Sequence, residues 1–454
     1  MTDAALIARY DGRVPRYTSY PTAPHFHAAI GAQTYSEWVQ ALAPEAPLSL
    51  YLHVPFCDRL CLYCGCNTSV VRHERPRRLY AEILAQEIEL LAKTLGRKAK
   101  VTQIHWGGGT PTALPDDCLV TLMEVIRAQF AVSPQAEIAV ELDPVSLTPN
   151  KLDVLGRMGI NRASLGVQDF SVPVQKAIGR MQSFEETQEA ATGLRRLGVT
   201  SLNLDLIYGL PYQDIASVQD TARLALALNP DRAAVFGYAH VPWMKKHQAL
   251  MPEDALPDSL VRLEQEQAIR KVLEQEGQMV PVGLDHYAKA EDSMAKAALA
   301  GRLQRGFQGY TTDEAPVLLG LGASSIGALP QGYVQNHSSV PAYEAEITQG
   351  RFAIAKGVAL SAEDRLRRAV IERIMCDLAI DLPAMAASFG ADAAPLLENA
   401  KGLERFVEDG LVTFNGSALC VTEAGRPFVR NVAALFDAYL GKMPANQPRH
   451  SRAV

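Results

Sequence analysis

The chain has 454 residues, of which 48% are hydrophobic and 21% charged, so it is long enough for two or three domains with a large apolar core. Its formal net charge of −6 gives no reason to expect a nucleic-acid partner. No run of about 18 apolar residues and no apolar signal core occur, which predicts a cytoplasmic chain without a membrane span.

The first 47 residues are interrupted by proline and serine, as in PRYTSYPTAPHF. Frequent proline and serine residues disfavour long helices and strands. We therefore expect residues 1–47 to form an N-terminal arm that lies over the active site of a neighbouring domain.

From Leu48 onward, short β-branched runs alternate with amphipathic helical patterns such as LYAEILAQEIELLAKTL. The predicted strands begin at Leu48, Val101, Glu137, Arg162, Ser201 and Ala233, with a seventh at Met279. This alternation predicts a parallel sheet with crossover helices. Because no GxGxxG follows the first strand, we expect an α/β fold, a partial (βα)6-7 TIM-like barrel over residues 48–330, with its chemistry at the carboxyl ends of the strands.

After about Gln331 the alternation stops. The stretch SAEDRLRRAVIERIMCDLAI predicts a long helix opened by a serine cap, and two short strands are expected around Asn415 and Gly416. Residues 331–454 therefore predict a mainly helical, winged-helix-like domain. Since it has no basic recognition face, we interpret it as a lid and not as a reader of DNA.

The stretch HVPFCDRLCLYCGCN, which starts at His53, contains four of the seven cysteines. Cys57, Cys61 and Cys64 form CxxxCxxC directly after the first predicted strand. Three thiolates can each bind one iron of a cubane cluster and leave the fourth iron open for a small molecule. Two alternatives stay open: a zinc site with Cys66 as fourth ligand, and a redox dithiol of Cys61 and Cys64.

Two further strand ends carry polar or unusual residues. HWGGGTPT, which starts at His105, has three consecutive glycines that would let backbone groups approach a ligand closely. A tight turn is the alternative, but three consecutive glycines exceed what a turn needs. Glu141 in VELDP ends the third strand, where a carboxylate can accept hydrogen bonds from ribose or ammonium groups or be a solvated rim residue.

The CxxxCxxC motif after a first barrel strand, with an aromatic residue, Tyr63, before the last cysteine, resembles the radical S-adenosylmethionine superfamily. Over nearly the full length, the ordered motifs PRYTSYPTAPHF, YLHVPFCDRLCLYCGCN, HWGGGTPT, ELDP, RASLGVQDF, NLDLIYGLP, YAHVP and FQGYTT are similar to those of the oxygen-independent coproporphyrinogen III oxidases. Cys66, in CxxxCxxCxC, and the PRYTSYPT arm separate this group from related haem-handling proteins that share the barrel.

This resemblance implies an enzyme of haem biosynthesis that decarboxylates the ring A and ring B propionates of coproporphyrinogen III to vinyl groups, giving protoporphyrinogen IX through a 5′-deoxyadenosyl radical. It implies one 4Fe–4S cluster on Cys57, Cys61 and Cys64, and two S-adenosylmethionine molecules. It also implies a reducing electron donor of the flavodoxin or ferredoxin type and a final electron acceptor, and we expect a monomer. Alternatives are a haem-binding or haem-transfer protein on the same scaffold and a non-catalytic, zinc-stabilised barrel.

The resemblance also implies site residues. Cys66 and Tyr51 are the implied catalytic residues, with Cys66 not bound to iron. The cluster-bound S-adenosylmethionine is expected to contact Tyr51, Gly108, Glu141 and Ile326. The second molecule is expected to contact Tyr63, Gly109, Thr110, Gln168, Arg180, Asp205 and Ala239.

The residues that bind the substrate are the part of the site for which the sequence gives the weakest indication. The four propionates of coproporphyrinogen III require positive charge, and the candidates are Arg16, Lys245, Lys246, Arg302 and Arg305. His105 and His240 lie near predicted strand ends, where we expect them to make structural hydrogen bonds.

Overall fold

The computed structural model describes residues 3–440 and residue 452, and its core is one twelve-stranded sheet. Six parallel strands follow one another in chain order: β1 (Leu48–Val54), β4 (Lys100–Gly108), β5 (Ala131–Leu142), β6 (Arg162–Gln168), β7 (Ser201–Tyr208) and β8 (Arg232–Gly237). The α/β class and the six predicted strands are therefore confirmed.

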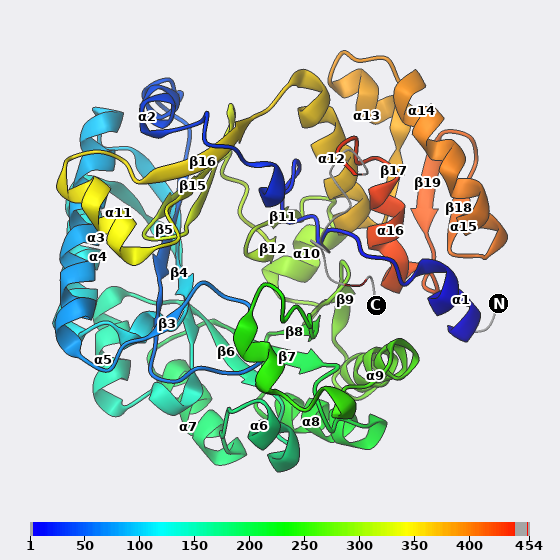
Figure 1. Cartoon of the computed structure of the whole chain (residues 1–454), viewed down its shortest axis with the longest axis horizontal. Coiled ribbons are helices and arrows are strands. Elements are labelled where there is room, and N and C mark those ends of the chain that lie inside the picture. The colour runs from blue at the N-terminus through cyan, green and yellow to red at the C-terminus, as the bar shows by residue number, and fades with distance from the viewer. Residues whose placement is uncertain (1–2, 441–451, 453–454) are drawn as a thin grey trace.

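Crossover helices cover the outer side of this curved sheet, as Figure 1 shows. They are α3 (Glu74–Leu95), α4 (Asp116–Gln129), α5 (Pro149–Met158), α7 (Phe184–Arg196) and α8 (Ile215–Ala227). Alternate residues of β1, such as Leu50 and Leu52, join the same buried core as Leu84 and Ile88 of α3. Because side chains alternate along a strand, Tyr51 and the other odd-numbered residues of β1 face the interior of the barrel.

The predicted seventh strand at Met279 is wrong in its direction. The chain there forms a hairpin of β9 (Val280–Val282) and β10 (His286–Ala288), and β10 pairs antiparallel with β8. Gly283 adopts a φ of 57°, and a Cβ there would lie 2.1 Å from the ring of Tyr310, so only glycine fits this reversal. The seventh parallel strand is instead β13 (Val317–Leu321), which pairs with β1.

On the β13 side, the sheet continues through three antiparallel strands, β14 (Ile326–Leu329), β15 (Gly332–Asn336) and β16 (Ile354–Ala359). The boundary expected between residues 330 and 331 thus falls between two paired strands of one sheet. We propose a boundary near residue 360 instead, because a hairpin cannot be divided without exposing its unpaired backbone groups.

The C-terminal part begins with α12 (Ala362–Asp377), which the predicted cap Ser361 opens in a capping box with Asp364. A small sheet of β17 (Ala379–Asp381), β19 (Ala418–Val421) and β18 (Val412–Phe414) follows, with two strands on either side of Asn415 and Gly416 as expected. The helices are α13 (Leu382–Ser388), α14 (Ala394–Ala400), α15 (Glu404–Glu408) and α16 (Val429–Ala434). They bury a hydrophobic core separate from that of the barrel.

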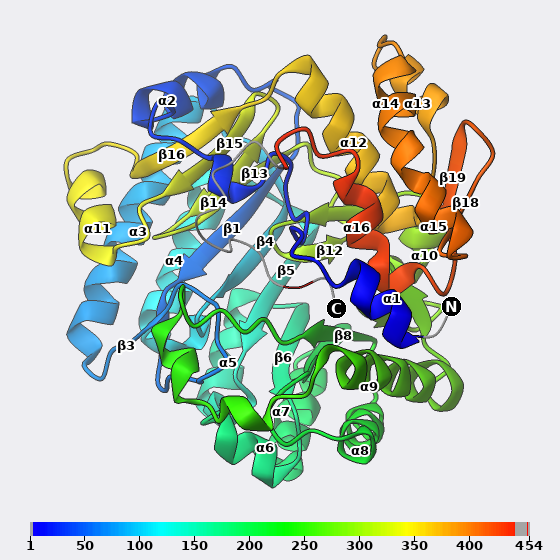
Figure 2. The same cartoon turned by 45° about the vertical axis from the view of Figure 1, so that its right-hand side comes forward.

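The N-terminal arm contains α1 (Asp3–Tyr10) and α2 (Ala32–Gln40) and runs between the barrel and the C-terminal helices, as Figure 2 shows. Tyr10 stacks on Phe406 at a centroid distance of 4.7 Å. Arg430 of α16 donates hydrogen bonds to the backbone oxygens of Val14 and Pro15. The arm is thus anchored to the C-terminal part. Among the helices of the described residues, none has the length and apolarity required to cross a bilayer.

Candidate functional site

A cavity of about 460 Å³, which we call the cysteine cavity, lies at the carboxyl ends of the parallel strands. Its lining includes thirteen of the predicted site residues: Cys57, Cys61, Tyr63, Cys64, Cys66, Gly108, Gly109, Thr110, Glu141, Gln168, Arg180, Asp205 and Ala239. These residues come from six strand ends and loops that are far apart in the sequence. Their convergence follows from the parallel topology, which brings the carboxyl ends of all strands to one rim.

The cysteine loop is held in place by backbone hydrogen bonds on several sides. It begins at β2 (Phe56–Cys57), which pairs with β3 (Ser69–Val70) beyond the loop. The backbone N–H of Leu62 donates to the oxygen of Ile178 at 2.9 Å, and that of Thr110 to the oxygen of Phe56 at 2.7 Å. The loop is therefore anchored by neighbouring strand ends without a metal.

Each thiol of the loop has a polar neighbour. The sulfur of Cys57 lies 3.1 Å from the hydroxyl of Thr68 and 3.6 Å from that of Thr110, and burial raises the pKa of this thiol. A hydrogen bond from the Cys66 thiol outweighs burial and lowers the pKa of Cys64 to about 6. The same hydrogen bond raises the pKa of Cys66, whose side chain is exposed to the cavity.

The spacing of the thiols can be compared with what different metal groups require. Among the described residues, no three His, Cys, Asp or Glu side chains converge on one point closely enough to hold a single ion. A zinc site needs four ligands within about 2.3 Å of one ion, whereas a cubane cluster takes one thiolate on each of its irons. Three cysteines spread around one end of the cavity fit the cluster and disfavour zinc.

The three glycines at the end of β4 are required by neighbouring protein atoms. A Cβ on Gly109 would lie 2.5 Å from the oxygen of Phe56 and 3.0 Å from the sulfur of Cys57. A Cβ on Gly107 or Gly108 would lie 2.7 Å from an atom of Glu141 or His53, respectively. The glycines thus let the cysteine loop and two polar side chains pack directly against the backbone of β4.

Glu141 is held as an ionised carboxylate on the cavity wall. One oxygen lies 3.0 Å from Nε2 of His105, and the other accepts from the backbone N–H of Gly108 at 3.2 Å. Burial raises the pKa of Glu141, but these hydrogen bonds and the nearby histidine charges together bring it below its ordinary value. His105 therefore has the structural role expected for it.

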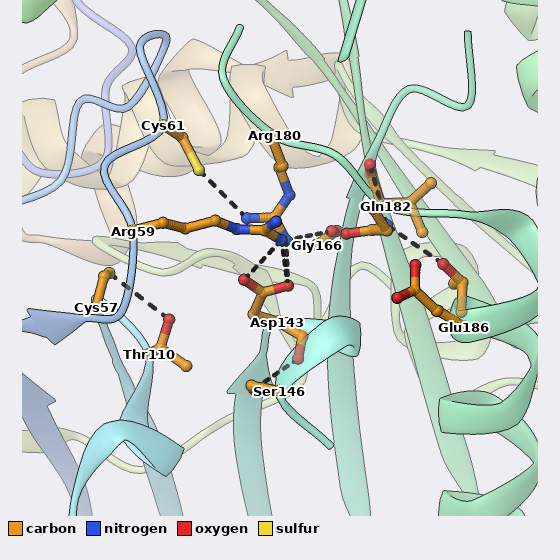
Figure 3. Close-up of polar contacts among 12 residues, drawn as sticks. Cys57, Arg59, Cys61, Thr110, Asp143, Ser146, Gly166, Arg180, Gln182 and Glu186 are labelled. Carbon is orange, nitrogen blue, oxygen red and sulfur yellow. Dashed lines mark hydrogen bonds and ion pairs between the residues drawn. The ribbon is translucent and has the colours of Figure 1, made fainter. Parts of the chain in front are cut away.

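Arg180 and a residue that the sequence analysis missed, Asp143, form the main ionic contact of the cavity (Figure 3). The guanidinium of Arg180 donates to Asp143 at 3.1 Å, to the oxygen of Gly166 at 2.7 Å and to the sulfur of Cys61 at 3.5 Å. Arg59 binds both oxygens of Asp143 at 3.0 Å. One carboxylate thus serves two arginines, and the group retains one net positive charge.

Asp143 could have been found from the sequence. It lies two residues after Glu141 in the ELDP motif, and residues at this spacing face the same side of a strand. Of these two carboxylates, only Glu141 was predicted to belong to the site.

The remaining predicted residues differ in how they are held. Asp205 accepts hydrogen bonds from Ser164 and Asn203, both at 2.8 Å, and burial raises its pKa to about 6. Gln168 adopts a φ of 67° where the register of β6 and β7 shifts, and no described residue hydrogen-bonds to its side chain. The amide of Gln168 is therefore available to a ligand.

Gln248, which the sequence analysis also missed, connects two predicted residues. Its side-chain nitrogen donates to the backbone oxygens of Tyr63 and Ala239, at 2.9 and 3.2 Å. Lys245 and the ring of His247 contact the oxygens of Cys66 and Cys64, each at 2.8 Å. The segment after β8 therefore supports the cysteine loop, a role that no local sequence pattern indicates.

Tyr51 and Ile326 do not line the cysteine cavity. The hydroxyl of Tyr51 lies 3.1 Å from Nδ1 of His53, and Nε2 of His53 lies 3.0 Å from the backbone oxygen of Asn67. Tyr51 thus reaches the end of the cysteine loop through His53. Ile326 packs against the cluster that contains Phe26.

Comparisons with known proteins agree with this geometry. Residues 51–225 match the family model of the radical SAM superfamily, and residues 360–428 match that of the HemN C-terminal domain. The chain is 50% identical to the oxygen-independent coproporphyrinogen III oxidase of Bradyrhizobium diazoefficiens, over 99% of this chain and 100% of that protein. It is 44% identical to the protein of that name from Paracoccus denitrificans, over 95% and 96% of the two chains.

Among solved structures, the coproporphyrinogen III oxidase (HemN) of Escherichia coli, described as a radical SAM enzyme, matches with a TM-score of 0.89 at 37% identity. The alignment covers 97% of this chain and 99% of that one. The similarity therefore includes the arm, the barrel and the C-terminal part.

Proposed function

The chain belongs to the oxygen-independent coproporphyrinogen III oxidases of the radical SAM superfamily, and on this premise we propose how the residues of its cysteine cavity perform the reaction. The enzyme acts in haem biosynthesis. For each of two propionates, the side chain CH2CH2COO− becomes CH=CH2 and CO2, with one hydrogen atom and one electron removed. The observation that carries the proposal is the convergence in one cavity of thirteen family-implied residues, three of which are the cysteines of the CxxxCxxC motif.

Cys57, Cys61 and Cys64 would hold the 4Fe–4S cluster that radical SAM enzymes use. When bound, the cluster and S-adenosylmethionine supply the radical that takes a hydrogen atom from the propionate. The chain fits this group because its three thiols line one end of the cavity, and because Gly109 leaves no room for a side chain between the strand end and the sulfur of Cys57.

Several residues would orient S-adenosylmethionine. Glu141 is ionised and faces the cavity, so it can accept hydrogen bonds from an ammonium or ribose group. Arg180 shares Asp143 with Arg59, and the positive charge that remains can attract the carboxylate of a second molecule. The free amide of Gln168 can bind the same molecule. These groups support our proposal that the cavity binds two S-adenosylmethionine molecules.

Cys66 and Tyr51 would have different roles. Cys66 has an accessible thiol in the cavity and is not needed as a cluster ligand, so it can contact the substrate directly. Tyr51 is a positioning residue in this proposal, because its hydroxyl acts on the cysteine loop through His53 and Asn67. Ile326 would contribute packing around the site at most.

The other expectations stay predictions. They are a flavodoxin- or ferredoxin-type electron donor, a separate final electron acceptor, a monomeric state and a cytoplasmic location. The family alone supports the need for a donor, because the cluster must be reduced by one electron at each turnover.

The test is anaerobic incubation of the protein with a reductant, S-adenosylmethionine and coproporphyrinogen III, followed by mass analysis. We expect protoporphyrinogen IX, with loss of two CO2 and formation of 5′-deoxyadenosine. Tight haem binding without a vinyl product would instead indicate a haem-transfer protein. Absence of iron and acid-labile sulfide in anaerobically purified protein would contradict the cluster assignment.

A further inference from the structure

A second, smaller cavity of about 60 Å³ adjoins the cysteine cavity, and we call it the arginine cavity. Its lining includes five arginines: Arg16 from the arm, Arg262 from α9 (Ser259–Lys271), Arg305 from β11 (Gln304–Gly306), Arg430 from α16, and Arg452, which pairs with Asp11 at 2.9 Å. The two cavities share Arg16, Phe236, Gly237 and Tyr238 as lining residues. A ligand in the cysteine cavity can therefore extend a side chain into the arginine cavity.

The positive charge of this cavity is not balanced by the protein. In the described part of the chain, no carboxylate lies within 4 Å of the guanidinium of Arg16, Arg262 or Arg305. The partners of Arg16 and Arg305 are backbone oxygens: Arg16 donates to Gly237 at 2.9 Å, and Arg305 to Arg16 at 3.0 Å. A neutral carbonyl satisfies a hydrogen bond but does not cancel a charge.

Several donor atoms of these arginines are also unused. Nε of Arg262 and both Nε and Nη1 of Arg305 are buried without a hydrogen-bond partner. Arg16 keeps much of its surface accessible although protein surrounds it, because it faces the two cavities. Buried donors without partners are rare in folded proteins, since each one loses its bonds to water.

The acidic groups nearby relieve this excess only in part. Asp285 lines the cavity and its charge acts on Arg16 and Arg305 without an ion pair to either, while its hydrogen bond goes to His286 at 2.7 Å. Glu266 also lines it, and burial raises the pKa of Glu266 to about 7. Burial lowers the pKa of Arg16 and Arg262, and lowers that of Arg430 to about 9. The lowered pKa values of these arginines express the cost of positive charges gathered away from water, whereas the raised pKa of Glu266 expresses the cost of burying a negative charge.

The size of the cavity selects the kind of anion. Its volume of about 60 Å³ is far smaller than the 460 Å³ of the cysteine cavity, so it suits a small anionic group such as a carboxylate better than a whole macrocycle. A forked guanidinium binds carboxylates through paired hydrogen bonds. The macrocycle would have to remain in the cysteine cavity while one of its acidic arms enters the arginine cavity.

We propose that the arginine cavity binds the carboxylate of a propionate that is not decarboxylated, and thereby orients the tetrapyrrole so that a reacting propionate faces the cysteine loop. The inference rests on the proposed function for its substrate. It assigns substrate binding to Arg262 and Arg430, which the sequence did not suggest, together with Arg16 and Arg305. Of the other candidates, Arg302 and Lys246 are exposed and line neither cavity, and Lys245 holds the cysteine loop.

The first test compares substrate affinity in Arg262→Gln with that in Arg302→Gln. Arg262 makes no side-chain hydrogen bond to another described residue, so its removal should disturb the fold little. Arg302 is an exposed arginine paired with Glu314 and serves as the matched control. We expect the Kd for coproporphyrinogen III, measured by anaerobic equilibrium dialysis, to rise at least ~10-fold in Arg262→Gln, about 1.4 kcal/mol. The control should bind as the wild type does.

The second test changes the substrate and uses the wild-type protein. The probe is coproporphyrinogen III with its ring C and ring D propionates converted to methyl esters. In the wild type, we expect the Kd of the diester to be at least ~10-fold higher than that of the free acid. In Arg262→Gln, the two Kd values should differ by less than ~3-fold, because the variant no longer distinguishes a charged arm from a neutral one. The comparison in the wild type tests the inference even if the arginine variant fails to fold.

Equal affinity of the wild type for the acid and the diester would overturn the inference, as would unchanged affinity in Arg262→Gln. Failure of the proposed function would have a different signature. In that case the wild type would lack iron or would not cleave S-adenosylmethionine, and both are measured without the tetrapyrrole.

Discussion

The cysteine cavity and the arginine cavity differ in how the protein treats buried positive charge. In the cysteine cavity, Arg59 and Arg180 share the carboxylate of Asp143 (Figure 3). In the arginine cavity, Arg262 and Arg305 have no carboxylate within 4 Å in the described residues. In the cysteine cavity one carboxylate thus offsets one of two arginine charges, whereas Arg262 and Arg305 lack such a partner, and we infer that this larger excess of charge marks where an anionic arm of the substrate binds.

The largest expected effect concerns the loop cysteines. Replacement of Cys57, Cys61 or Cys64 by alanine should remove the cluster, because each is the ligand of one iron, and no vinyl product should form. Cys66→Ala should retain iron and acid-labile sulfide and yet lose turnover. Iron analysis and product assay on each variant check this, with the exposed Cys420→Ala as control. Loss of iron in Cys66→Ala would show that this residue is a ligand.

Deletion of residues 1–22 should leave the cluster intact and reduce turnover at least ~100-fold. The deletion removes Arg16 from both cavities and removes the backbone oxygens to which Arg430 donates. We attribute that factor to two lost contacts with a substrate carboxylate, one from the deleted Arg16 and one from Arg430, whose position the arm no longer fixes. Each is a charge-assisted hydrogen bond of about 1.5 kcal/mol. Iron content and product formation are the measurements, and full activity in the truncated protein would exclude the arm from the site.

Asp143→Asn should break the charge balance of the cysteine cavity. Arg180, whose side chain is only 9% exposed, would lose its anionic partner, and we expect the free energy of unfolding to fall by about 3 kcal/mol. Urea denaturation of the anaerobic protein measures this. In the control Asp117→Asn, which removes an exposed pair with Arg78, the midpoint should stay unchanged. Equal stability of the two variants would contradict the role given to Asp143.

Gly109→Ala should displace the cysteine loop. The new methyl group would lie 2.5 Å from the oxygen of Phe56 and 2.6 Å from the hydroxyl of Thr68, and such overpacking costs about 1–3 kcal/mol. We expect lower iron content after reconstitution. Gly65→Ala, in the same loop, meets no atom within 4 Å and should reconstitute as the wild type does. Full reconstitution of both would show that the loop tolerates the shift.

The smallest effect is a pH dependence of substrate binding in the arginine cavity. Because the pKa of Glu266 is raised to about 7, this side chain is neutral in acid and becomes negative as the pH rises through 7. It then opposes a bound carboxylate, so the Kd for coproporphyrinogen III should rise about fivefold between pH 6 and 8, roughly 1 kcal/mol. Glu266→Gln should remove this rise.

The groups that face Glu266 do not produce the same change. Burial keeps the pKa of Tyr287 well above this range, and the pKa of Asp205, in the other cavity, is raised only to about 6. The charged or polar groups around Glu266 are Arg270, Arg426, Tyr287 and Glu274. A pH profile that is the same in the wild type and in Glu266→Gln would assign the effect to another group.

Much of the cysteine cavity could be predicted from the sequence because most of its lining residues lie in short, contiguous motifs. The CxxxCxxCxC loop, the glycines before Thr110 and the ELDP strand end are each contiguous, and parallel strands bring such ends to one rim. The hairpin of β9 and β10 was missed because its direction depends on a single turn at Gly283. The antiparallel strands β15 and β16, which extend the sheet beyond β14, were missed because they are not separated by the strand–helix alternation on which the prediction relied.

By itself, the amino-acid sequence determined the fold class, the order of the six parallel strands and the identity of the loop cysteines, because these depend on local periodicity and local spacing. Only the tertiary structure decided that Asp143 is shared by two arginines and that five arginines from distant parts of the chain line one small cavity. The physical reason is that a charge acts through space. Whether an arginine is balanced depends on which side chains the fold places beside it, and sequence distance does not record this.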